Sequence, residues 1–299
     1  MNLNTLDIEN NFLAIDEEFS SLEKSEIVVL SAPYEHTVSY GGGAEKGPAG
    51  IINASAYVEF YDNETDKELC FEKGIATLEA IDFKGAKDKE ALDIISTYVS
   101  QLLDLGKFVI TLGGEHTISS APIKSHFEKF PDMCILHFDA HSDLRDSYQD
   151  SIYSHACIMA RVAEFFPTNK IHQVGIRAQC KEEAEFIKAN SISTYYASEI
   201  RTGKYGSDWQ KTIVNSLGQN IYVTFDVDFF DPSIMPATGT PEPDGFLYSE
   251  TIDVFREIRK QGKNIIGLDV VELAPVEGLH HCDLTTARLI YKILNLKYY

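Results

Sequence analysis

The stretch Phe138-Asp139-Ala140-His141-Ser142-Asp143 decides how the rest of the chain is interpreted. It follows the apolar run Met133-Cys134-Ile135-Leu136, which is typical of a buried strand. Because alternate residues leaving a strand point the same way, Asp139, His141 and Asp143 are expected to converge at its carboxyl end. Two carboxylates at one point repel each other unless a cation lies between them. Carboxylate and imidazole ligands suit a divalent ion such as Mn²⁺, Zn²⁺, Fe²⁺ or Ni²⁺, and a solvated acidic turn is the alternative for this stretch alone.

Two further stretches repeat the pattern. The β-rich run 221–225 ends in Asp226-Val227-Asp228, and the run 108–112 ends in Gly113-Gly114-Glu115-His116. An open α/β sheet places its active site at the carboxyl ends of its strands. Six ligands, four of them anionic, are too many for one tetrahedral ion and suit two neighbouring ions that share carboxylates. The candidate ligands are His116, Asp139, His141, Asp143, Asp226 and Asp228.

These motifs carry a resemblance. Gly-Gly-Glu-His, Asp-Ala-His-Ser-Asp and Phe-Asp-Val-Asp-Phe-Phe-Asp-Pro resemble, in order and spacing, the signatures of the ureohydrolase (arginase/agmatinase) family, over about Val28 to Ile293. The resemblance implies a three-layer α/β/α fold with a mostly parallel central sheet of about eight strands. It also implies a homo-oligomer, a trimer or a hexamer, and two Mn²⁺ ions per chain. His116, Asp139, Asp143 and Asp226 would hold one ion, and His141, Asp139, Asp226 and Asp228 the other.

The same resemblance implies the chemistry. Two neighbouring ions can activate a shared water, which attacks a guanidinium and releases urea and an amine. Glu272, after the apolar run 267–271, would accept hydrogen bonds from the guanidinium, and His155 would move protons. A surface salt bridge for Glu272 and a helix cap for His155 are the alternatives. His280, His281 and Asp283 are expected on a loop without a ligand role, and His137 is expected to turn away into strand packing.

The substrate is less constrained. The segment Pro236–Gly245 and the run Gln173-Val174-Gly175-Ile176-Arg177 resemble the agmatinase version of the family, which makes agmatine the expected substrate, with putrescine and urea as products. Arg145 stands where arginases typically carry an Asn and would suit an anionic tail. Guanidinobutyrate, guanidinopropionate, arginine and aminopropylagmatine therefore remain alternatives.

Composition excludes other partners. A net charge of −20, from 26 basic against 46 acidic residues, disfavours nucleic acid. Such a charge would attract a cationic substrate, and a role in solubility alone is the alternative. Five cysteines without a Cys-x-x-Cys pair favour a reducing compartment. The first 21 residues do not resemble a signal peptide, and no run is long enough for a membrane span, so a cytoplasmic enzyme without membrane contact is expected.

The order of elements predicts the architecture. Strand-like and helical runs alternate from residue 26 onward, for example the helical spacing over 87–105, without a linker or a break in composition. We expect a terminal arm at 1–24, lying on the body or on a neighbouring subunit, and a single domain at 25–299. Alternation alone leaves a TIM barrel possible, whereas the resemblance favours the open sheet.

Two functions of other classes fit these residues less well. A metal-dependent deacetylase shares the α/β plan but has no use for His116 or for the pair Asp226 and Asp228. A non-catalytic, regulatory homologue is disfavoured because every ligand position, together with His155 and Glu272, carries a competent side chain.

Overall fold

One parallel sheet organises the chain. In the computed structural model, which describes residues 3–299, all eight strands pair in parallel in the order β2-β1-β3-β8-β7-β4-β5-β6. The order has two free ends, β2 and β6, so the sheet is open and the TIM barrel is excluded. The strands are β1 (Ile27–Ala32), β2 (Ile75–Thr77), β3 (Phe108–Gly113), β4 (Cys134–Phe138), β5 (Ile171–Val174), β6 (Ser193–Tyr195), β7 (Asn220–Asp226) and β8 (Asn264–Val271).

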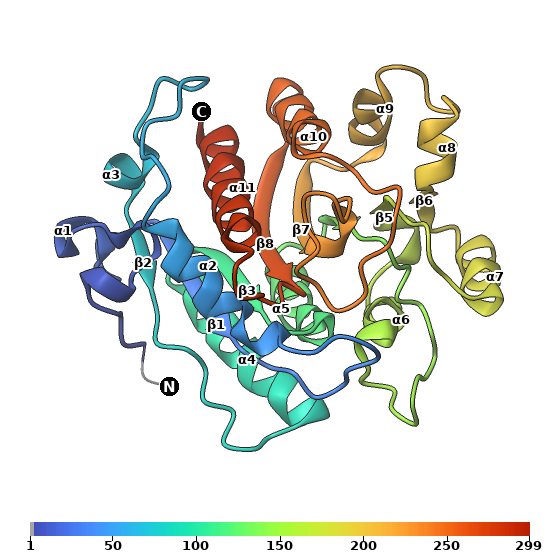
Figure 1. Cartoon of the computed structure of the whole chain (residues 1–299), viewed down its shortest axis with the longest axis horizontal. Coiled ribbons are helices and arrows are strands. Elements are labelled where there is room, and N and C mark those ends of the chain that lie inside the picture. The colour runs from blue at the N-terminus through green and yellow to red at the C-terminus, as the bar shows by residue number, and fades with distance from the viewer. Residues whose placement is uncertain (1–2) are drawn as a thin grey trace.

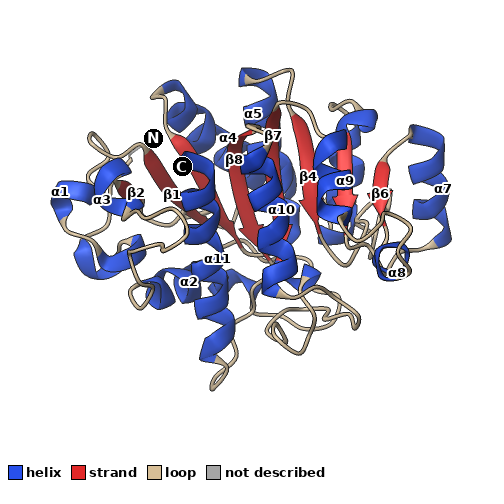
Figure 2. Cartoon of the chain, turned by 90° about the horizontal axis from the view of Figure 1, so that it is seen from above, coloured by secondary structure: helices blue, strands red, loops and turns tan. Residues whose placement is uncertain are grey.

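Helices cover both faces of this sheet. Figure 2 shows α4 and α5 on one side and α2, α10 and α11 on the other, which confirms the three-layer α/β/α prediction. The helices are α1 (Glu17–Ser20), α2 (Gly47–Ser55), α3 (Leu69–Lys73), α4 (Asp88–Asp104), α5 (Ser120–Lys129), α6 (Ile158–Ala163), α7 (Lys181–Asn190), α8 (Ala197–Arg201), α9 (Trp209–Ser216), α10 (Tyr248–Lys260) and α11 (His280–Tyr298). The carboxyl end of the chain lies on the half of the molecule that carries β2 and α3 (Figure 1).

Apolar patterning explains these elements. Strands covered on both faces must be apolar throughout, and β1 is buried at all of its positions. The helix α4 instead buries one stripe, formed by Ala91, Ile95, Val99 and Leu102, against the strands β1 and β3.

The strand order also creates the crevice for a site. The chain passes from β3 to β4, yet β8 and β7 lie between these two strands in the sheet. Crossover connections on either side of such a switch point leave in opposite directions, and this opens a crevice at the carboxyl ends of the strands. The ends of β3, β8, β7 and β4 therefore lie next to one another at that crevice.

The structure differs from the sequence expectations at one edge of the sheet and at the start of the last helix. The three-residue edge strand β2 is absent from the prediction, and His280 and His281 begin the helix α11 instead of lying on a loop.

The amino-terminal segment packs against the body of the protein. Phe12 and Leu13 are fully buried, and their main-chain N–H groups donate to the hydroxyls of Thr77 (2.8 Å) and Ser55 (2.7 Å). Across residues 3–299, no helix combines the length and apolar character that crossing a bilayer requires.

Candidate active site

His116 lies at the centre of a ring of carboxylates. The turn that carries it is tight, because a Cβ on Gly114 would collide with the main-chain oxygen of Tyr34. The Nδ1 atom of His116 lies 3.1 Å from Asp139 Oδ2, 3.2 Å from Asp143 Oδ2 and 3.4 Å from Asp226 Oδ2. All four side chains are buried: that of Asp143 is 8 % exposed, and the other three are at most 4 % exposed. Residues from the ends of β3, β4 and β7 thus meet at one buried point.

The other nitrogen of His116 decides which proton this ring carries. His116 Nε2 lies 3.0 Å from the hydroxyl of Thr224, and that hydroxyl donates to Asp269 Oδ1 at 2.8 Å. Since the hydroxyl has one proton and gives it to Asp269, it accepts from His116 Nε2–H. Nδ1 is then the nitrogen left to bind a metal ion, which it does through its lone pair when it is unprotonated. Within residues 3–299 it is buried without a hydrogen-bond partner, and its lone pair faces carboxylate oxygens. A cation satisfies this arrangement, because it accepts all of these lone pairs.

A second group of ligand atoms adjoins the first. His141 Nδ1 lies 2.8 Å from Asp228 Oδ2 and 3.6 Å from Asp139 Oδ1. Asp139 therefore directs one oxygen towards His116 and the other towards His141. The ligand atoms of Asp139, His141 and Asp228 lie within 4.8 Å of one another, which is a spacing that could hold a metal ion. The donors are nitrogen and oxygen atoms, which suit a divalent first-row metal.

Strand alternation, however, is not what brings Asp139, His141 and Asp143 together. The strand β4 ends at Phe138, and Asp143 has the left-handed backbone angle φ 52°. The chain instead turns on Asp139, whose Oδ1 accepts from the main-chain N–H of His141 at 2.6 Å. The sequence argument predicted convergence correctly but gave the wrong local geometry for it.

The prediction for His137 is wrong. Its ring is fully buried beside the site, with Nε2 2.7 Å from Asp139 Oδ2, and it forms a further potential metal-binding group with His116 and Asp139. Gln173 Nε2 lies 3.1 Å from His137 Nδ1 and orients the ring from behind. His137, which was expected in strand packing, therefore holds the carboxylate of Asp139, and Asp139 contributes to both ligand groups.

The electrostatics of this cluster require positive charge. Burial raises the pKa of Asp226 well above its usual range, and the charges of Asp228 and Asp139 add to the effect. Burial also opposes a charge on Asp139, but the charge of His137 and the hydrogen bond from its ring hold the pKa of that carboxyl well below its usual value. The carboxylates cannot all be ionised at neutral pH unless cations neutralise them.

Glu272 faces the same crevice from the end of β8. Its Oε1 accepts from the main-chain N–H of His116 at 2.6 Å, and its backbone is left-handed, with φ 65°. Burial raises the pKa of this carboxyl to about 8. The second oxygen, Oε2, lies 3.8 Å from the position that a Cβ of Gly239 would occupy. Glu272 thus offers a partly buried carboxylate that a cationic ligand would keep ionised.

His155 lies beside the loop between β1 and α2. Its Nδ1 is 3.0 Å from the hydroxyl of Thr37, and its Nε2 is 3.2 Å from the hydroxyl of Ser39. Burial lowers the pKa of this imidazole below its ordinary value, while the charge of Asp143 acts in the opposite direction. Thr37 in turn donates to Glu115 Oε1 at 3.0 Å. The structure therefore places His155 near the carboxylate ring and against the β1–α2 loop. The motifs alone did not predict this contact with the loop.

Charged residues surround the opening. Arg145 packs on the ring of Tyr148, 4.9 Å from its centre, and its Nε lies 3.9 Å from Glu183 Oε2. The carboxylate of Glu242 lies 4.0 Å from His141 Nε2, and its side chain is 39 % exposed. Arg177 donates to the main-chain oxygens of Asp228 and Glu242, at 2.6 and 3.0 Å, and so joins a ligand-bearing segment to the loop at the opening.

Sequence reasoning missed the support behind His116. Thr224 and Asp269 are opposite each other in the pairing of β7 with β8, and Asp269 is fully buried. A signal was available, because a charged residue inside an apolar strand is rare unless it is paired. Asp269 interrupts the apolar run 267–271 in this way.

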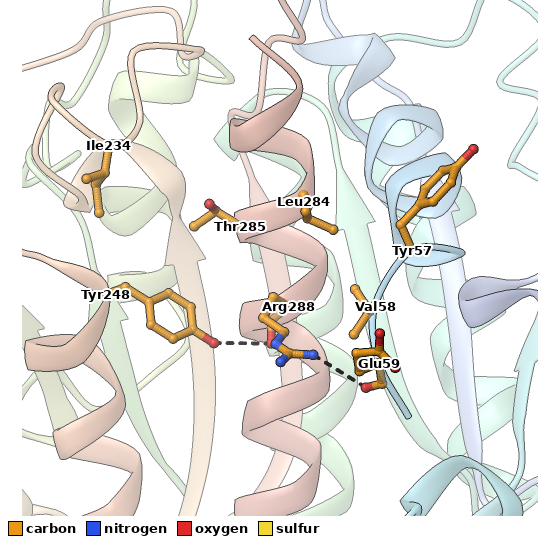
Figure 3. A pocket seen from close by; sticks show the side chains of 8 residues that line it. All are labelled: Tyr57, Val58, Glu59, Ile234, Tyr248, Leu284, Thr285 and Arg288. Carbon is orange, nitrogen blue, oxygen red and sulfur yellow. Dashed lines mark hydrogen bonds between the residues drawn. The ribbon is translucent and has the colours of Figure 1, made fainter. Parts of the chain in front are cut away.

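A separate cavity of about 460 Å³ lies between the end of α2, α10 and α11, with Tyr57, Tyr248 and Leu284 in its wall. Figure 3 shows Tyr248 donating to the main-chain oxygen of Arg288 (3.3 Å), while the guanidinium of Arg288 donates to that of Glu59 (3.4 Å). Among the described residues, none of the candidate ligands lines this cavity.

Known proteins resemble the chain along nearly its whole length. A profile of the arginase family matches residues 25–295. An N(1)-aminopropylagmatine ureohydrolase of Synechocystis is 35% identical over 285 residues, which cover 93% of this chain and 91% of that protein. An agmatinase of Bacillus anthracis is 37% identical over 269 residues, covering 89% and 88%. The solved structure of an agmatine ureohydrolase of Thermoplasma volcanium superposes with a TM-score of 0.83 at 26% identity, covering 99% of this chain and 95% of that one. The chain therefore belongs to the arginase family.

Proposed function

We propose that this protein is a binuclear-manganese ureohydrolase that converts agmatine and water into putrescine and urea. The observation that supports it most strongly is the position of His116 Nδ1, which faces carboxylate oxygens of Asp139, Asp143 and Asp226 at 3.1 to 3.4 Å. Neighbouring ligand groups that share Asp139 suit two ions better than one. The arginase-family membership and the relatives named as ureohydrolases support the same reaction.

The ligands are assigned to two ions. His116, Asp139, Asp143 and Asp226 would hold one Mn²⁺, and His141, Asp139, Asp226 and Asp228 the other. Two bound ions would lower the pKa of a shared water and supply the nucleophile at neutral pH. The protein's part is to hold four buried carboxylates and two imidazoles in a cluster whose negative charge bound cations would neutralise.

Glu272 and His155 would act on the substrate. A guanidinium entering the crevice meets the carboxylate of Glu272, which is held in place by the N–H of His116 at 2.6 Å. Planar guanidinium groups pair well with carboxylates, so this contact would orient the central carbon of the substrate. His155 would then give a proton to the departing amine, because an imidazole exchanges protons near neutral pH.

The charges at the opening favour a cationic tail. Arg145 is occupied by Glu183 and by the ring of Tyr148, whereas the carboxylate of Glu242 is half-exposed beside His141. The ammonium of agmatine would therefore meet a carboxylate and not a free guanidinium. An aminopropylagmatine is the second candidate, because its extended tail is also cationic and a relative with that name is 35% identical.

Urea release tests this proposal. We expect Mn²⁺-loaded protein to have the highest kcat/KM on agmatine or on N1-aminopropylagmatine, with lower values on 4-guanidinobutyrate, 3-guanidinopropionate and arginine. Glu242→Gln should raise KM for the cationic substrates and leave KM for guanidinobutyrate almost unchanged. If guanidinobutyrate is preferred and Arg145→Ala removes that preference, the substrate is a guanidino acid. If no guanidino compound yields urea, the proposal is wrong.

We also propose a reducing compartment and a homo-oligomeric assembly. The five cysteines are free, and four of them are buried, which suits a reducing compartment such as the cytoplasm. A homo-oligomer, implied by the family resemblance, stays a prediction that light scattering can measure.

A further inference from the structure

The loop between β1 and α2 is fastened to Glu115, the acidic residue of the Gly-Gly-Glu-His motif. Glu115 Oε2 accepts from the main-chain N–H groups of His36 (2.8 Å) and Thr37 (2.6 Å). The Glu115 side chain is buried, at 2 % exposure. Both donors are main-chain groups, so their protons are fixed and this oxygen must act as an acceptor. The loop therefore has a defined position relative to the end of β3.

Thr37 continues this contact to His155. Its hydroxyl donates to Glu115 Oε1 at 3.0 Å, and it lies 3.0 Å from His155 Nδ1. The main-chain N–H of His155 also donates to the hydroxyl oxygen, at 3.1 Å. A hydroxyl has one proton to give, and when Glu115 is ionised, with its two oxygens accepting from three donors, that proton goes to Glu115. Two lone pairs would face each other at 3.0 Å unless Nδ1 of His155 carries a proton.

From this direction of donation, we propose that Glu115 and Thr37 are positioning residues that keep a proton on His155 Nδ1 and make Nε2 the atom that exchanges protons. The inference rests on the proposed role of His155 as the proton donor. It specifies Nε2 as the atom of His155 that transfers the proton. It also gives Glu115, the acidic residue of the Gly-Gly-Glu-His motif, a function apart from metal binding.

Proton exchange at Nε2 fits the surroundings of that atom. Nε2 lies 3.2 Å from the hydroxyl of Ser39, a residue on the solvent side of the loop. The hydroxyl of Ser39 is free to donate to neutral Nε2 or to accept from Nε2–H, since neither orientation is set by a second contact within residues 3–299. In turnover, one proton would leave Nε2 for the departing nitrogen of the substrate and would be replaced from solvent. The proton on Nδ1 would stay with Thr37 throughout.

The test compares tautomers of His155 in matched variants. The full-length protein, labelled with ¹⁵N-histidine and loaded with diamagnetic Zn²⁺, is recorded at a pH well above 7. There the imidazole is neutral and Glu115, whose pKa burial raises to about 7, is ionised. The His155→Asn variant identifies the His155 signals among the nine histidines. Long-range ¹H–¹⁵N spectra of the wild type should show Nδ1 protonated and Nε2 unprotonated. Thr37→Ser keeps the hydroxyl and should retain this pattern, as should Ser39→Ala, which contacts only Nε2.

Two variants should change the pattern. Thr37→Val removes the acceptor, so the Nδ1–H tautomer should no longer dominate. Glu115→Gln should invert it, because the new amide would donate to Thr37 and turn the Thr37 hydroxyl towards Nδ1. With Mn²⁺ bound, Thr37→Val should lower kcat at least tenfold with little change in KM or metal content, and Thr37→Ser should restore most of it.

Either of two results would overturn the proposal. One is an Nδ1–H tautomer that persists in both Thr37→Val and Glu115→Gln. The other is a Thr37→Ser variant as impaired as Thr37→Val, which would indicate a packing role. The tautomer measurement does not depend on turnover. A protein that releases no urea from any guanidino compound would therefore refute the proposed function, whereas the spectra would still decide the tautomer of His155.

Discussion

Thr224→Val should weaken metal binding although Thr224 is not a proposed ligand. The Thr224 hydroxyl joins His116 Nε2 (3.0 Å) to Asp269 Oδ1 (2.8 Å) deep between β7 and β8. Valine has nearly the same shape, so the packing of the strands is kept while both hydrogen bonds are lost. His116 Nε2–H is then left without an acceptor, and the ring loses the contact that sets its tautomer.

The magnitude follows from those contacts. Asp269 keeps two of its three donors, Ser119 and Tyr222, each at 2.7 Å. The main loss is therefore at His116, where an unsatisfied buried donor costs about 1–3 kcal/mol. Removing the partner behind a metal-binding histidine typically lowers metal affinity about 10–100-fold. That factor corresponds to about 1.4–2.7 kcal/mol of binding free energy.

Calorimetric titration with Mn²⁺ measures this loss, and thermal unfolding with Mn²⁺ or with EDTA provides a second measurement. The matched control is Thr286→Val in α11, which removes a buried hydroxyl that donates to the main-chain oxygen of Cys282 at 2.9 Å. The control should lower stability in EDTA without changing Mn²⁺ affinity. Wild-type affinity in Thr224→Val, or an equal loss in both variants, would show that the Thr224–Asp269 pair does not act through His116.

Three other outcomes are expected. Metal analysis should find about two Mn²⁺ per chain, as a shared-carboxylate site requires, and Asp139→Asn or Asp226→Asn should lose both ions and all urea release; full activity with one tightly held ion would contradict this. His155→Asn should keep both ions and lower turnover about 10²–10⁴-fold, and near-normal turnover would leave that residue a structural role. Burial lowers the pKa of His172 to about 4, so neutral His172 stabilises the folded state above the unfolded pKa of about 6.5, and that stability is lost as the pH falls towards 4. Urea unfolding of metal-free protein at several pH values between 7 and 5 measures this effect. The free energy of unfolding should change less steeply with pH in His172→Asn than in the wild type, and an identical pH dependence would refute this assignment.

Much of the fold follows from the sequence because parallel strands have a strong signature. Strands buried on both faces appear as continuous apolar runs, and helices between them keep a 3.6-residue spacing. Chemistry-bearing residues at three strand ends were therefore expected to meet, and they do. The edge strand β2 has only three residues, too few to show a period, and its pairing with β1 is what makes it a strand.

The parts of the site that escaped prediction depend on contacts between distant residues. Thr37 and Glu115 are 78 positions apart, and nothing in either segment indicates that one binds the other. The ring of His137 reaches Asp139 because β4 ends at Phe138 and the chain turns there, which no periodicity reveals. Spacing within a motif identifies ligand candidates, whereas the side chains that orient them come from elsewhere in the fold.

The left-handed backbones of Asp143 and Glu272, with φ of 52° and 65°, set a limit for protein engineering. Side chains in such conformations cost about 1–3 kcal/mol each, and glycine or asparagine would relieve part of that cost. A directed-evolution screen that rewards heat resistance alone would therefore enrich substitutions at these two positions. The selected proteins would be more robust but would lack the carboxylates, so a screen of this kind should hold both positions constant or select for urea release at the same time.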